Sequence, residues 1–334
     1  MSRRVSRREA LRRGLLGVAG VAGAGVVARA EATDSVVHAH LDASHVMTGG
    51  LPKDAGIDPT AFLTAFDRGT VSRRANGQTV REYRIIASDR NIEVMPGLFY
   101  PAWTYNGQVP GPTLRATEGD LVRVHFENAG THEHTMHFHG FHAANMDGVF
   151  EQVPPGGSYV YEFEADPFGL HLYHCHTMPL KRHIAKGLYG AFVVDPKRGR
   201  PAAHEMVMVM NGFDVNFDAE NEVYAVNTVP FAYQAQPIVL RKGELNRIYL
   251  VNALEFDLVN SLHIHATFFN LFRTGTSLTP SELTDTVTMG QGERHILEFS
   301  YRHSGKFMFH AHQSEFAELG WMGLFDVRDR GVTA

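Results

Sequence analysis

Leu121-Val-Arg-Val-His-Phe126 and Ser158-Tyr-Val-Tyr-Glu-Phe163 alternate apolar and polar side chains with the period of two that is typical of a half-buried β-strand. Similar short stretches follow from residue 76 onward, and turns containing Gly, Pro and Asn separate them. No segment has the pattern of a crossover helix, which argues against a parallel α/β sheet. We therefore expect an all-β protein built from antiparallel sandwiches or barrels.

The strand-rich region contains an internal repeat. Four motifs occur twice, in the same order: Pro112-Thr-Leu-Arg-Ala-Thr-Glu-Gly-Asp-Leu121 and Pro237-Ile-Val-Leu-Arg-Lys-Gly-Glu-Leu245, His137-Phe-His139 and His263-Ile-His265, His174-Cys-His176 and His310-Ala-His312, and Gly190-Ala-Phe-Val-Val194 and Gly323-Leu-Phe-Asp-Val327. A repeat of this length predicts two related domains, which we place at 76–197 and 203–334. The basic segment Asp195-Pro-Lys-Arg-Gly-Arg-Pro201 would link them.

The first thirty residues have the pattern of an export signal. Ser6-Arg7-Arg8-Glu9-Ala10-Leu11 is a twin-arginine motif, an apolar run from Gly14 to Ala28 follows it, and Ala28-Arg29-Ala30 offers a cleavage site. The run is too short and too rich in glycine to suit the alternative of a membrane anchor. We therefore predict a signal peptide at 1–30 and a mature protein that is periplasmic or extracellular.

Residues 31–75 resemble a polar extension with one short helix. Asp58 would cap this helix, Pro59 would occupy its first turn, and Gly69 follows its end. The histidines at 38, 40 and 45 fall in the extension, and we interpret them as solvated residues rather than metal ligands.

The net charge argues against two classes of partner. The 334 residues include 31 Lys and Arg and 36 Asp and Glu, for a net charge of −5. The segment 1–30 holds seven Arg and one Glu, so its removal would lower the charge to −11. Nucleic acids and anionic membranes are therefore not expected partners. Beyond that segment, no stretch is apolar enough to predict a membrane span.

The 20 histidines are clustered, and four His-x-His pairs occupy matching places in the two repeats. Residues i and i+2 of a strand point to the same face, so each pair would present two imidazoles side by side. Neutral imidazole is the commonest metal ligand in proteins. A single pair could be incidental, but four matching pairs predict a metal cluster that involves both domains.

The same alternation separates a second site from the first. Cys175, the single cysteine, must face away from His174 and His176, and His134 has the opposite parity to His137. Cys175, His134 and the later His183 can therefore meet on the other side of the sheet. A thiolate with two imidazoles and a weak or absent axial ligand is the blue-copper arrangement. The alternative for Cys175 is an inert buried thiol.

The second repeat lacks this site but retains its paired histidines. Asn260 stands at the place of His134, and Ala311 replaces the cysteine. Loss of one site and retention of the other indicate that the retained histidines serve a function shared between the domains.

These motifs resemble the multicopper oxidases, specifically the two-domain, laccase-like bacterial enzymes with blue copper in the first domain. The resemblance implies two cupredoxin-like Greek-key domains and about four coppers per functional unit, one type 1, one type 2 and two type 3. It also implies a homotrimer with each cluster between two subunits. The implied ligands are His134, Cys175 and His183 for type 1, His137 and His263 for type 2, and His139, His174, His176, His265, His310 and His312 for type 3, with Leu188 as an axial residue that does not ligate.

The expected activity is one-electron oxidation of phenolic, amine or metal-ion donors, coupled to four-electron reduction of O2 to water. Asp147, in Asn145-Met-Asp-Gly148, resembles the family's acidic residue beside the cluster and is a candidate proton donor, although Asp-Gly alone would also make a turn. Glu315 is a second candidate. His142 and His171 fit no ligand position, and Met206, Met208 and Met210 fit a strand face in the core.

Two alternatives stay open. The long spacing from Cys175 to His183 and the run Glu315-Phe-Ala-Glu-Leu-Gly320 resemble the copper nitrite reductases. Those enzymes normally carry Met at the place of Leu188 and lack the full set of four histidine pairs. The other alternative is a copper-binding or copper-tolerance protein with little turnover, which would not need the thiolate site.

Overall fold

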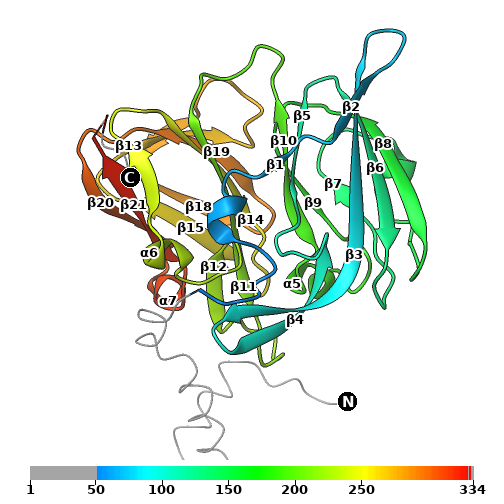
Figure 1. Cartoon of the computed structure of the whole chain (residues 1–334), viewed down its shortest axis with the longest axis horizontal. Coiled ribbons are helices and arrows are strands. Elements are labelled where there is room, and N and C mark those ends of the chain that lie inside the picture. The colour runs from blue at the N-terminus through cyan, green and yellow to red at the C-terminus, as the bar shows by residue number, and fades with distance from the viewer. Residues whose placement is uncertain (1–50, 330, 332–334) are drawn as a thin grey trace, which may run out of the picture. The chain divides into compact units, whose positions relative to one another are not determined.

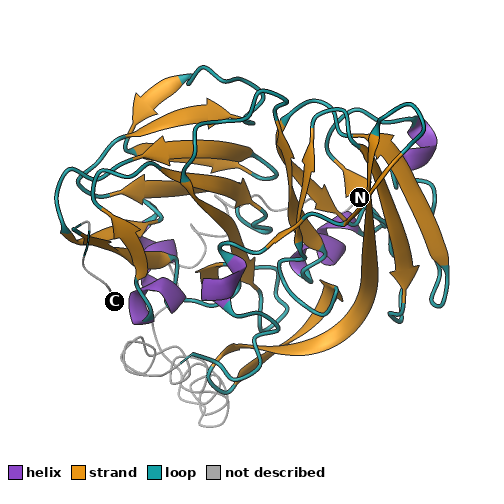
Figure 2. Ribbon diagram, turned by 45° about the horizontal axis from the view of Figure 1, so that its top comes forward, coloured by secondary structure: helices purple, strands orange, loops and turns teal. Residues whose placement is uncertain are grey.

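A computed structural model of the chain describes residues 51–329 and residue 331. The predicted signal peptide at 1–30 and the histidines at 38, 40 and 45 lie outside the described residues. Within the described part, strands dominate and every helix is short, as Figure 2 shows. The all-β prediction is therefore confirmed. Among the described helices, none has the length and apolar character needed to cross a membrane.

The first domain consists of two sheets with short helices between some strands. Its strands and helices are β1 (Phe66–Asp67), β2 (Thr70–Arg73), β3 (Thr79–Met95), β4 (Leu98–Tyr105), β5 (Thr113–Thr117), β6 (Leu121–Asn128), β7 (His137–Phe138), η2 (Ala144–Met146), β8 (Ser158–Glu164), β9 (Gly169–His174), α5 (Leu180–Ala185) and β10 (Tyr189–Asp195). One sheet has the order β1-β5-β10-β9-β7 and the other β2-β3-β6-β8, with β4 paired to β3.

The second domain repeats this plan. It contains β11 (His204–Phe213), β12 (Val223–Val226), α6 (Ala232–Ala235), β13 (Ile238–Arg241), β14 (Asn246–Asn252), β15 (Val259–Ile264), β16 (Phe269–Arg273), β17 (Glu282–Thr284), β18 (Thr286–Gly290), β19 (Arg294–Phe299), β20 (Gly305–His310), α7 (Ser314–Glu318) and β21 (Met322–Arg328). Its sheets have the orders β12-β11-β14-β19-β16-β17 and β13-β21-β20-β15-β18.

The expectation of antiparallel sandwiches or barrels needs one correction, because both domains also contain parallel pairs. In the first domain β3 pairs with β6 and β5 with β10 in parallel. In the second domain the corresponding pairs are β11 with β14 and β13 with β21. Greek-key connections place strands that are distant in sequence side by side, and alternation within a single strand gives no information about the direction of its neighbour.

Each domain packs its own hydrophobic core between its two sheets. Met206, Met208 and Met210 on β11 are completely buried in the core of the second domain, which confirms that they are packing residues. The cores hold the sheets in a fixed relation, so a residue at the end of a strand keeps a defined position.

The segment before residue 76 belongs to the fold more closely than its sequence suggested. Helix α4 (Pro59–Phe62) begins as predicted, with Asp58 Oδ1 accepting hydrogen bonds from the backbone amides of Thr60 and Ala61. After it, Leu63 enters the core of the second domain, whereas Phe66 pairs with a strand of the first (Figure 1). The predicted extension 31–75 thus contributes β1 and β2 to the sheets of the first domain.

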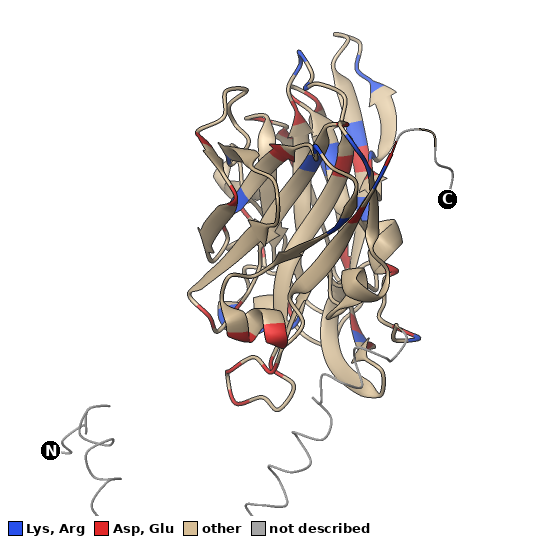
Figure 3. Cartoon of the chain, turned by 90° about the vertical axis from the view of Figure 1, so that its left-hand side faces the viewer, with Lys and Arg blue, Asp and Glu red and all other residues tan. Residues whose placement is uncertain are grey.

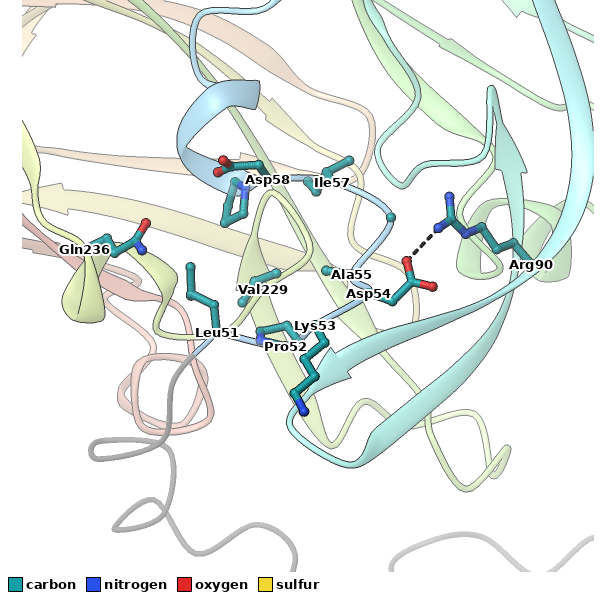
Figure 4. Close-up of a pocket in the computed structure, with 12 residues that line it drawn as sticks. Leu51, Pro52, Lys53, Asp54, Ala55, Ile57, Asp58, Arg90, Val229 and Gln236 are labelled. Atoms are coloured by element: carbon teal, nitrogen blue, oxygen red, sulfur yellow. Dashed lines mark hydrogen bonds and ion pairs between the residues drawn. The ribbon is translucent and has the colours of Figure 1, made fainter.

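A pocket of about 410 Å³ borders the start of the described chain, shown in Figure 4. Residues Leu51 to Pro59 form one wall, and Arg90, Val229 and Gln236 contribute from the two domains. The Asp54 carboxylate pairs with the Arg90 guanidinium at 2.6 Å across its rim. None of its lining residues belongs to the histidine motifs.

A network of ion pairs ties the two domains together. Arg115 of the first domain donates to Asp195 at 2.8 Å and to Glu205 of the second domain at 2.7 Å. Glu205 also accepts from Arg247 at 2.9 Å and from the Tyr249 hydroxyl at 2.7 Å. Acidic and basic positions lie close together on the strands in Figure 3. Glu205 therefore compensates two largely buried guanidinium groups at the domain boundary.

The charge of Glu205 persists in acid. Burial opposes its ionisation, but hydrogen bonds from Arg115 and Tyr249 outweigh burial and lower the pKa of Glu205 to about 2. Its stabilising contribution is therefore present above the pKa of the unfolded chain, near 4.3, and is lost as the pH falls through about 2.

We predict that Glu205→Ala lowers the free energy of unfolding at pH 7 by about 3 kcal/mol, because it leaves Arg115 and Arg247 without their shared partner. Urea unfolding of wild type and variant measures this difference, which should shrink as the pH is lowered from about 4 toward about 2. The exposed Glu244 provides the control, since Glu244→Ala should change stability by less than about 0.5 kcal/mol. Equal effects of the two substitutions would contradict the prediction.

Candidate metal centre

Three donor atoms from separate segments meet in the interior of the first domain. His134 follows β6, Cys175 comes directly after β9, and His183 lies on α5. The Cys175 Sγ atom lies 3.2 Å from His183 Nδ1 and 4.0 Å from His134 Nδ1, and the two Nδ1 atoms are 3.2 Å apart. All three residues are buried. The predicted meeting of these side chains is thus present in the structure.

These three donors are suited to a soft, redox-active metal such as copper. Burial lowers the pKa of His134 and of His183 to about 4, so both imidazoles are neutral at pH 7 and have a free lone pair. No carboxylate belongs to this group of donors in the described part of the chain. A thiolate with two neutral imidazoles favours copper over Mg²⁺ or Ca²⁺, which prefer oxygen ligands.

Two residues that the sequence analysis missed contact this group. The backbone amide of Thr135 donates to Cys175 Sγ at 3.4 Å, and the Thr135 hydroxyl accepts from the backbone amide of His176 at 3.0 Å. The Trp103 ring lies 4.7 Å from the ring of His183 and 5.2 Å from that of His134. No sequence motif marks Trp103, because it lies on β4, which is distant in sequence from the histidine motifs.

Leu188 is completely buried in the same core as Cys175, and its carbonyl accepts from the Cys175 amide at 3.0 Å. The long spacing between Cys175 and His183 is occupied by the start of α5, which carries His183 in its last turn.

The second domain fills the corresponding space with apolar side chains. The Ala311 amide donates to the Trp321 carbonyl, as Cys175 does to that of Leu188, so Trp321 is the counterpart of Leu188. The Trp321 amide donates to Phe316 O, as the Leu188 amide does to His183 O, so Phe316 is the counterpart of His183. Trp321 Nε1 donates to Asn260 Oδ1 at 3.1 Å. An indole–amide hydrogen bond thus replaces the donor set in this domain.

The histidine pairs are brought together by identical strand registers in both domains. His137 on β7 lies opposite His174 on β9, and His263 on β15 lies opposite His310 on β20. In the first domain the rings of His137, His139, His174 and His176 lie 5.1 to 5.9 Å from their neighbours. In the second, those of His263, His265, His310 and His312 lie 4.9 to 5.9 Å apart. We call these two groups the first and second half-sites.

Hydrogen bonds fix the tautomers of key histidines so that Nε2 is free to bind a metal. The Nδ1 atoms of His174 and His310 donate to the carbonyls of Cys175 and Ala311, at 2.9 and 2.6 Å. Their Nε2 atoms therefore carry lone pairs. His174 Nε2 lies 3.3 Å from His139 Nε2, and His310 Nε2 lies 3.0 Å from its counterpart on His265. Ring nitrogens that face each other in this way are arranged to share a metal ion.

Burial also favours the neutral form of three histidines in the first half-site, His137, His139 and His174. It lowers the pKa of His174 to about 4 and, together with the charge of Arg294, that of His139 to about 3. Burial similarly lowers the pKa of His137 and, in the second half-site, of His265. Neutral imidazoles need no deprotonation before they bind a metal.

Two aspartates occupy equivalent places beside the half-sites. His137 Nδ1 donates to the Asp147 carbonyl at 2.8 Å, and the Asp147 carboxylate lies 3.1 Å from the same atom. His263 Nδ1 donates to the Asp285 carbonyl at 2.9 Å, with the Asp285 carboxylate at 4.0 Å. Sequence analysis identified Asp147 but missed Asp285, because ten residues separate the first pair and 22 the second.

Three other residues that the sequence analysis considered, Glu315, His142 and His171, lie outside the two half-sites. The Glu315 side chain is exposed in the first turn of α7, and within the described residues no contact links its carboxylate to a histidine. His142 Nε2 donates to the Phe138 carbonyl at 2.8 Å and lies 3.7 Å from Asp147 Oδ1. His171 is buried and bonds the Pro167 carbonyl at 2.8 Å.

Within the described residues, each group of three or more His, Cys, Asp and Glu residues whose donor atoms lie within 4.8 Å of one another draws its members from a single domain. The two half-sites of one chain therefore do not share a compact donor set.

Both repeated domains match a known protein family. A family model described as multicopper oxidase matches residues 87–199, and a second with the same description matches residues 200–331. A crystal structure of a multicopper oxidase is 55% identical, covers 84% of this chain and 100% of its own, and superposes with a TM-score of 0.83. A blue copper oxidase from Nitrosomonas europaea is 28% identical, with a TM-score of 0.67 over 74% of this chain and 86% of its own.

The copper-containing nitrite reductase of Neisseria meningitidis (serogroup A / serotype 4A, strain DSM 15465 / Z2491) is 28% identical over 235 residues, which are 63% of this chain and 60% of that protein. The chain thus spans about 60% of the length of the curated nitrite reductases that it matches. The two multicopper oxidase matches together cover both repeated domains, and the donor sets in these domains are suited to copper. The chain therefore belongs to the multicopper oxidase family.

Proposed function

We propose that the protein is a laccase-like oxidase that couples one-electron oxidation of small donors to four-electron reduction of O2 to water. The observation that carries this proposal is the retention of all eight paired histidines in two matching half-sites, although the second domain has replaced the thiolate site. A protein that only transferred electrons would need the thiolate site alone.

The proposed copper ligands follow from the two donor sets. His134, Cys175 and His183 would hold the type 1 copper, and the nearby buried Leu188, the candidate axial residue, would offer no ligand atom. His137 and His263 would hold type 2, and His139, His174, His176, His265, His310 and His312 would hold the type 3 pair. When bound, copper supplies one-electron redox chemistry at the first site and O2 reduction at the cluster.

The chain itself connects these sites and supplies protons. Cys175 is linked through the backbone to His174 and His176, so a covalent path of a few bonds joins the two donor sets. The half-buried Asp147 carboxylate lies beside His137, where it can hold a proton for delivery to reduced oxygen. Glu315 is the weaker assignment for this role, because its side chain is exposed on α7.

We infer that each cluster forms between the first half-site of one subunit and the second half-site of the next in a homotrimer. The separation of donor groups by domain supports this inference. Large apolar side chains beside both half-sites are exposed in the single chain: Phe141 by 68%, Phe150 by 85% and Phe268 by 58%. Burial of such side chains is a driving force for a head-to-tail contact that closes into a ring.

The alternatives are less well supported. For a nitrite reductase two of the paired histidines would be surplus, and such an enzyme would normally have Met at the position of Leu188. A copper-storage or copper-tolerance protein would not need a buried thiolate site connected to the half-sites. The twin-arginine pattern at 1–30 supports export to the periplasm or beyond.

Copper content and Cys175→Ser test the proposal together. Wild type should hold about four coppers per chain, with about half silent in electron paramagnetic resonance because the type 3 pair is coupled. Cys175→Ser should lose the intense blue absorption and about one copper, and donor oxidation should fall by at least about 100-fold. The matched variant Ser304→Ala, at an exposed position, should change none of these values.

Two coppers per chain, both visible in the resonance spectrum, would contradict a coupled pair and favour nitrite reduction. Full copper loading without oxidation of any donor would instead favour a binding protein.

Leu188→Met tests the axial position. A thioether near the thiolate-bound copper should stabilise its oxidised form, so we expect the type 1 reduction potential to fall. Redox titration of the blue absorption measures the change. Leu250→Met, in the core of the second domain, is the control and should leave the potential unchanged. An unchanged or higher potential for Leu188→Met would contradict the axial assignment.

Mixed oligomers test the shared cluster. His139→Ala should inactivate the first half-site, and His265→Ala the second. If each cluster draws its half-sites from neighbouring subunits, random mixing of equal amounts of the two variants should give an intact cluster at about a quarter of the subunit contacts. Each of the two subunits at a contact contributes an intact half-site half of the time. Co-expression should therefore restore about a quarter of the wild-type activity. If both half-sites came from one subunit, the mixture would remain inactive.

A further inference from the structure

Ser261 lies on the face of β15 that carries His263 of the second half-site. In its sheet, β15 runs between β18 and β20 (Figure 1). Leu262 and Ile264 of this strand are buried in the core of the second domain. Successive residues of a strand face opposite sides, so Ser261 and His263 share the other face. Ser261 is itself buried. A buried hydroxyl that is not among the proposed copper ligands thus lies beside the paired histidines.

The Ser261 hydroxyl holds the chain directly after β20. It accepts a hydrogen bond from the His312 backbone amide at 2.8 Å and donates one to Gln313 Oε1. Gln313 is the N-cap residue of α7, but its side chain makes no capping hydrogen bond, and its Nε2 donates instead to the Val259 carbonyl at 3.4 Å. Because a serine hydroxyl has one hydrogen and two lone pairs, it can make both of its contacts at once. The hydroxyl therefore ties two consecutive residues of the loop to β15.

This backbone contact is important for His312, because no hydrogen bond fixes its ring. His263 and His310 each donate from Nδ1 to a backbone carbonyl. The His312 ring contacts these two rings, with centres 5.5 and 5.9 Å away, but within the described residues neither of its nitrogens has a hydrogen-bond partner. Strand β20 ends at His310, so His312 also lies beyond the strand. The position of its imidazole therefore depends on where its backbone is held.

The first domain has the same contact in the same place. The Thr135 hydroxyl accepts from the His176 backbone amide at 3.0 Å, and the Thr135 amide donates to Cys175 Sγ at 3.4 Å. The second domain has no thiolate, and there the Ser261 amide donates to Asn260 Oδ1 at 2.8 Å. Only the hydroxyl contact is common to both domains. This retention indicates that the hydroxyl serves the paired histidines rather than the thiolate site.

We propose that Ser261 is a positioning residue of the copper cluster. Its hydroxyl fixes the backbone of His312, so that this imidazole and that of His310 are presented together to the type 3 pair. Removal of a group that orients a metal ligand typically lowers metal affinity by roughly 10- to 100-fold. The proposal rests on the proposed oxidase function, which assigns His312 to the type 3 pair.

Ser261→Ala tests the proposal in the copper-loaded full chain. We expect the variant to bind cluster copper about tenfold more weakly, measured as the concentration of EDTA that removes half of this copper. The fraction of copper visible in electron paramagnetic resonance should rise above about half, because an incomplete type 3 pair is not coupled. The blue absorption should be unchanged, since the thiolate site lies in the first domain.

Two further variants separate the loss of this hydroxyl from a general effect. Ser261→Thr keeps a hydroxyl, as Thr135 does in the first domain, and should retain wild-type copper binding. Ser281→Ala removes a hydroxyl that donates to the Leu271 carbonyl at 2.9 Å in the same domain, and should leave copper binding and the resonance spectrum unchanged. Wild-type behaviour of Ser261→Ala, or an equal loss in either control, would overturn the proposal.

Hydrogen exchange separates this proposal from the oxidase function. In the copper-free full chain, the His312 amide of Ser261→Ala should exchange at least about tenfold faster than that of wild type, because it has lost its acceptor. Mass spectrometry of peptides that span His312 measures the rate. An unchanged rate would overturn the proposal. Faster exchange in Ser261→Ala, together with only two coppers per wild-type chain that are both visible in the resonance spectrum, would contradict the oxidase function alone.

Discussion

The alternation of side chains along one strand end is the constraint on which both copper sites depend. β9 ends at His174, and Cys175 follows within the same extended backbone. Because successive residues face opposite sides, the thiolate points into the core while its neighbouring imidazoles point away from it. A shift of one residue in the pairing of β9 would exchange these faces and abolish both sites at once. The cross-strand pairing of His174 with His137 fixes this register.

The two domains show how one fold can keep a site or fill it. The strand registers that position the half-sites are the same in both, but the buried space behind them has diverged. Removal of a thiolate and an imidazole would leave a cavity, which destabilises a domain in proportion to its volume. In the second domain Trp321 and Phe316 occupy the corresponding positions, and Asn260 accepts the indole N–H. The space is therefore packed without a metal.

Groups that do not bind metal determine how the donor atoms are presented. Backbone carbonyls hold Nδ1 of His137, His174, His263 and His310, which directs the Nε2 atoms toward the metal positions. The Thr135 amide donates to the Cys175 sulfur, where it would stabilise the charge of a metal-bound thiolate. Helix α5 carries His183 in its last turn and thereby positions this imidazole beside Cys175. Such contacts orient the metal ligands and tune the properties of a metal that they hold.

The sequence by itself indicated the candidate donor residues and their local geometry. Strand alternation, the internal repeat and the His-x-His spacing predicted an all-β fold of two related domains, paired imidazoles in both domains and the opposite orientation of Cys175 and its neighbours. These features depend on residues close together in the chain, where the period of two applies. The sequence also indicated that Asn260 and Ala311 had removed one site from the second domain.

Only the tertiary structure decided which distant residues support these sites. Parallel pairing of β3 with β6, the entry of residues 66–73 into the sheets, and the meeting of Trp103 with His183 all join segments separated by many residues. Asp285 escaped prediction because loop length, unlike strand period, is not conserved between the repeats. Long-range packing determines such neighbours, and the local periodicity of the sequence does not predict them.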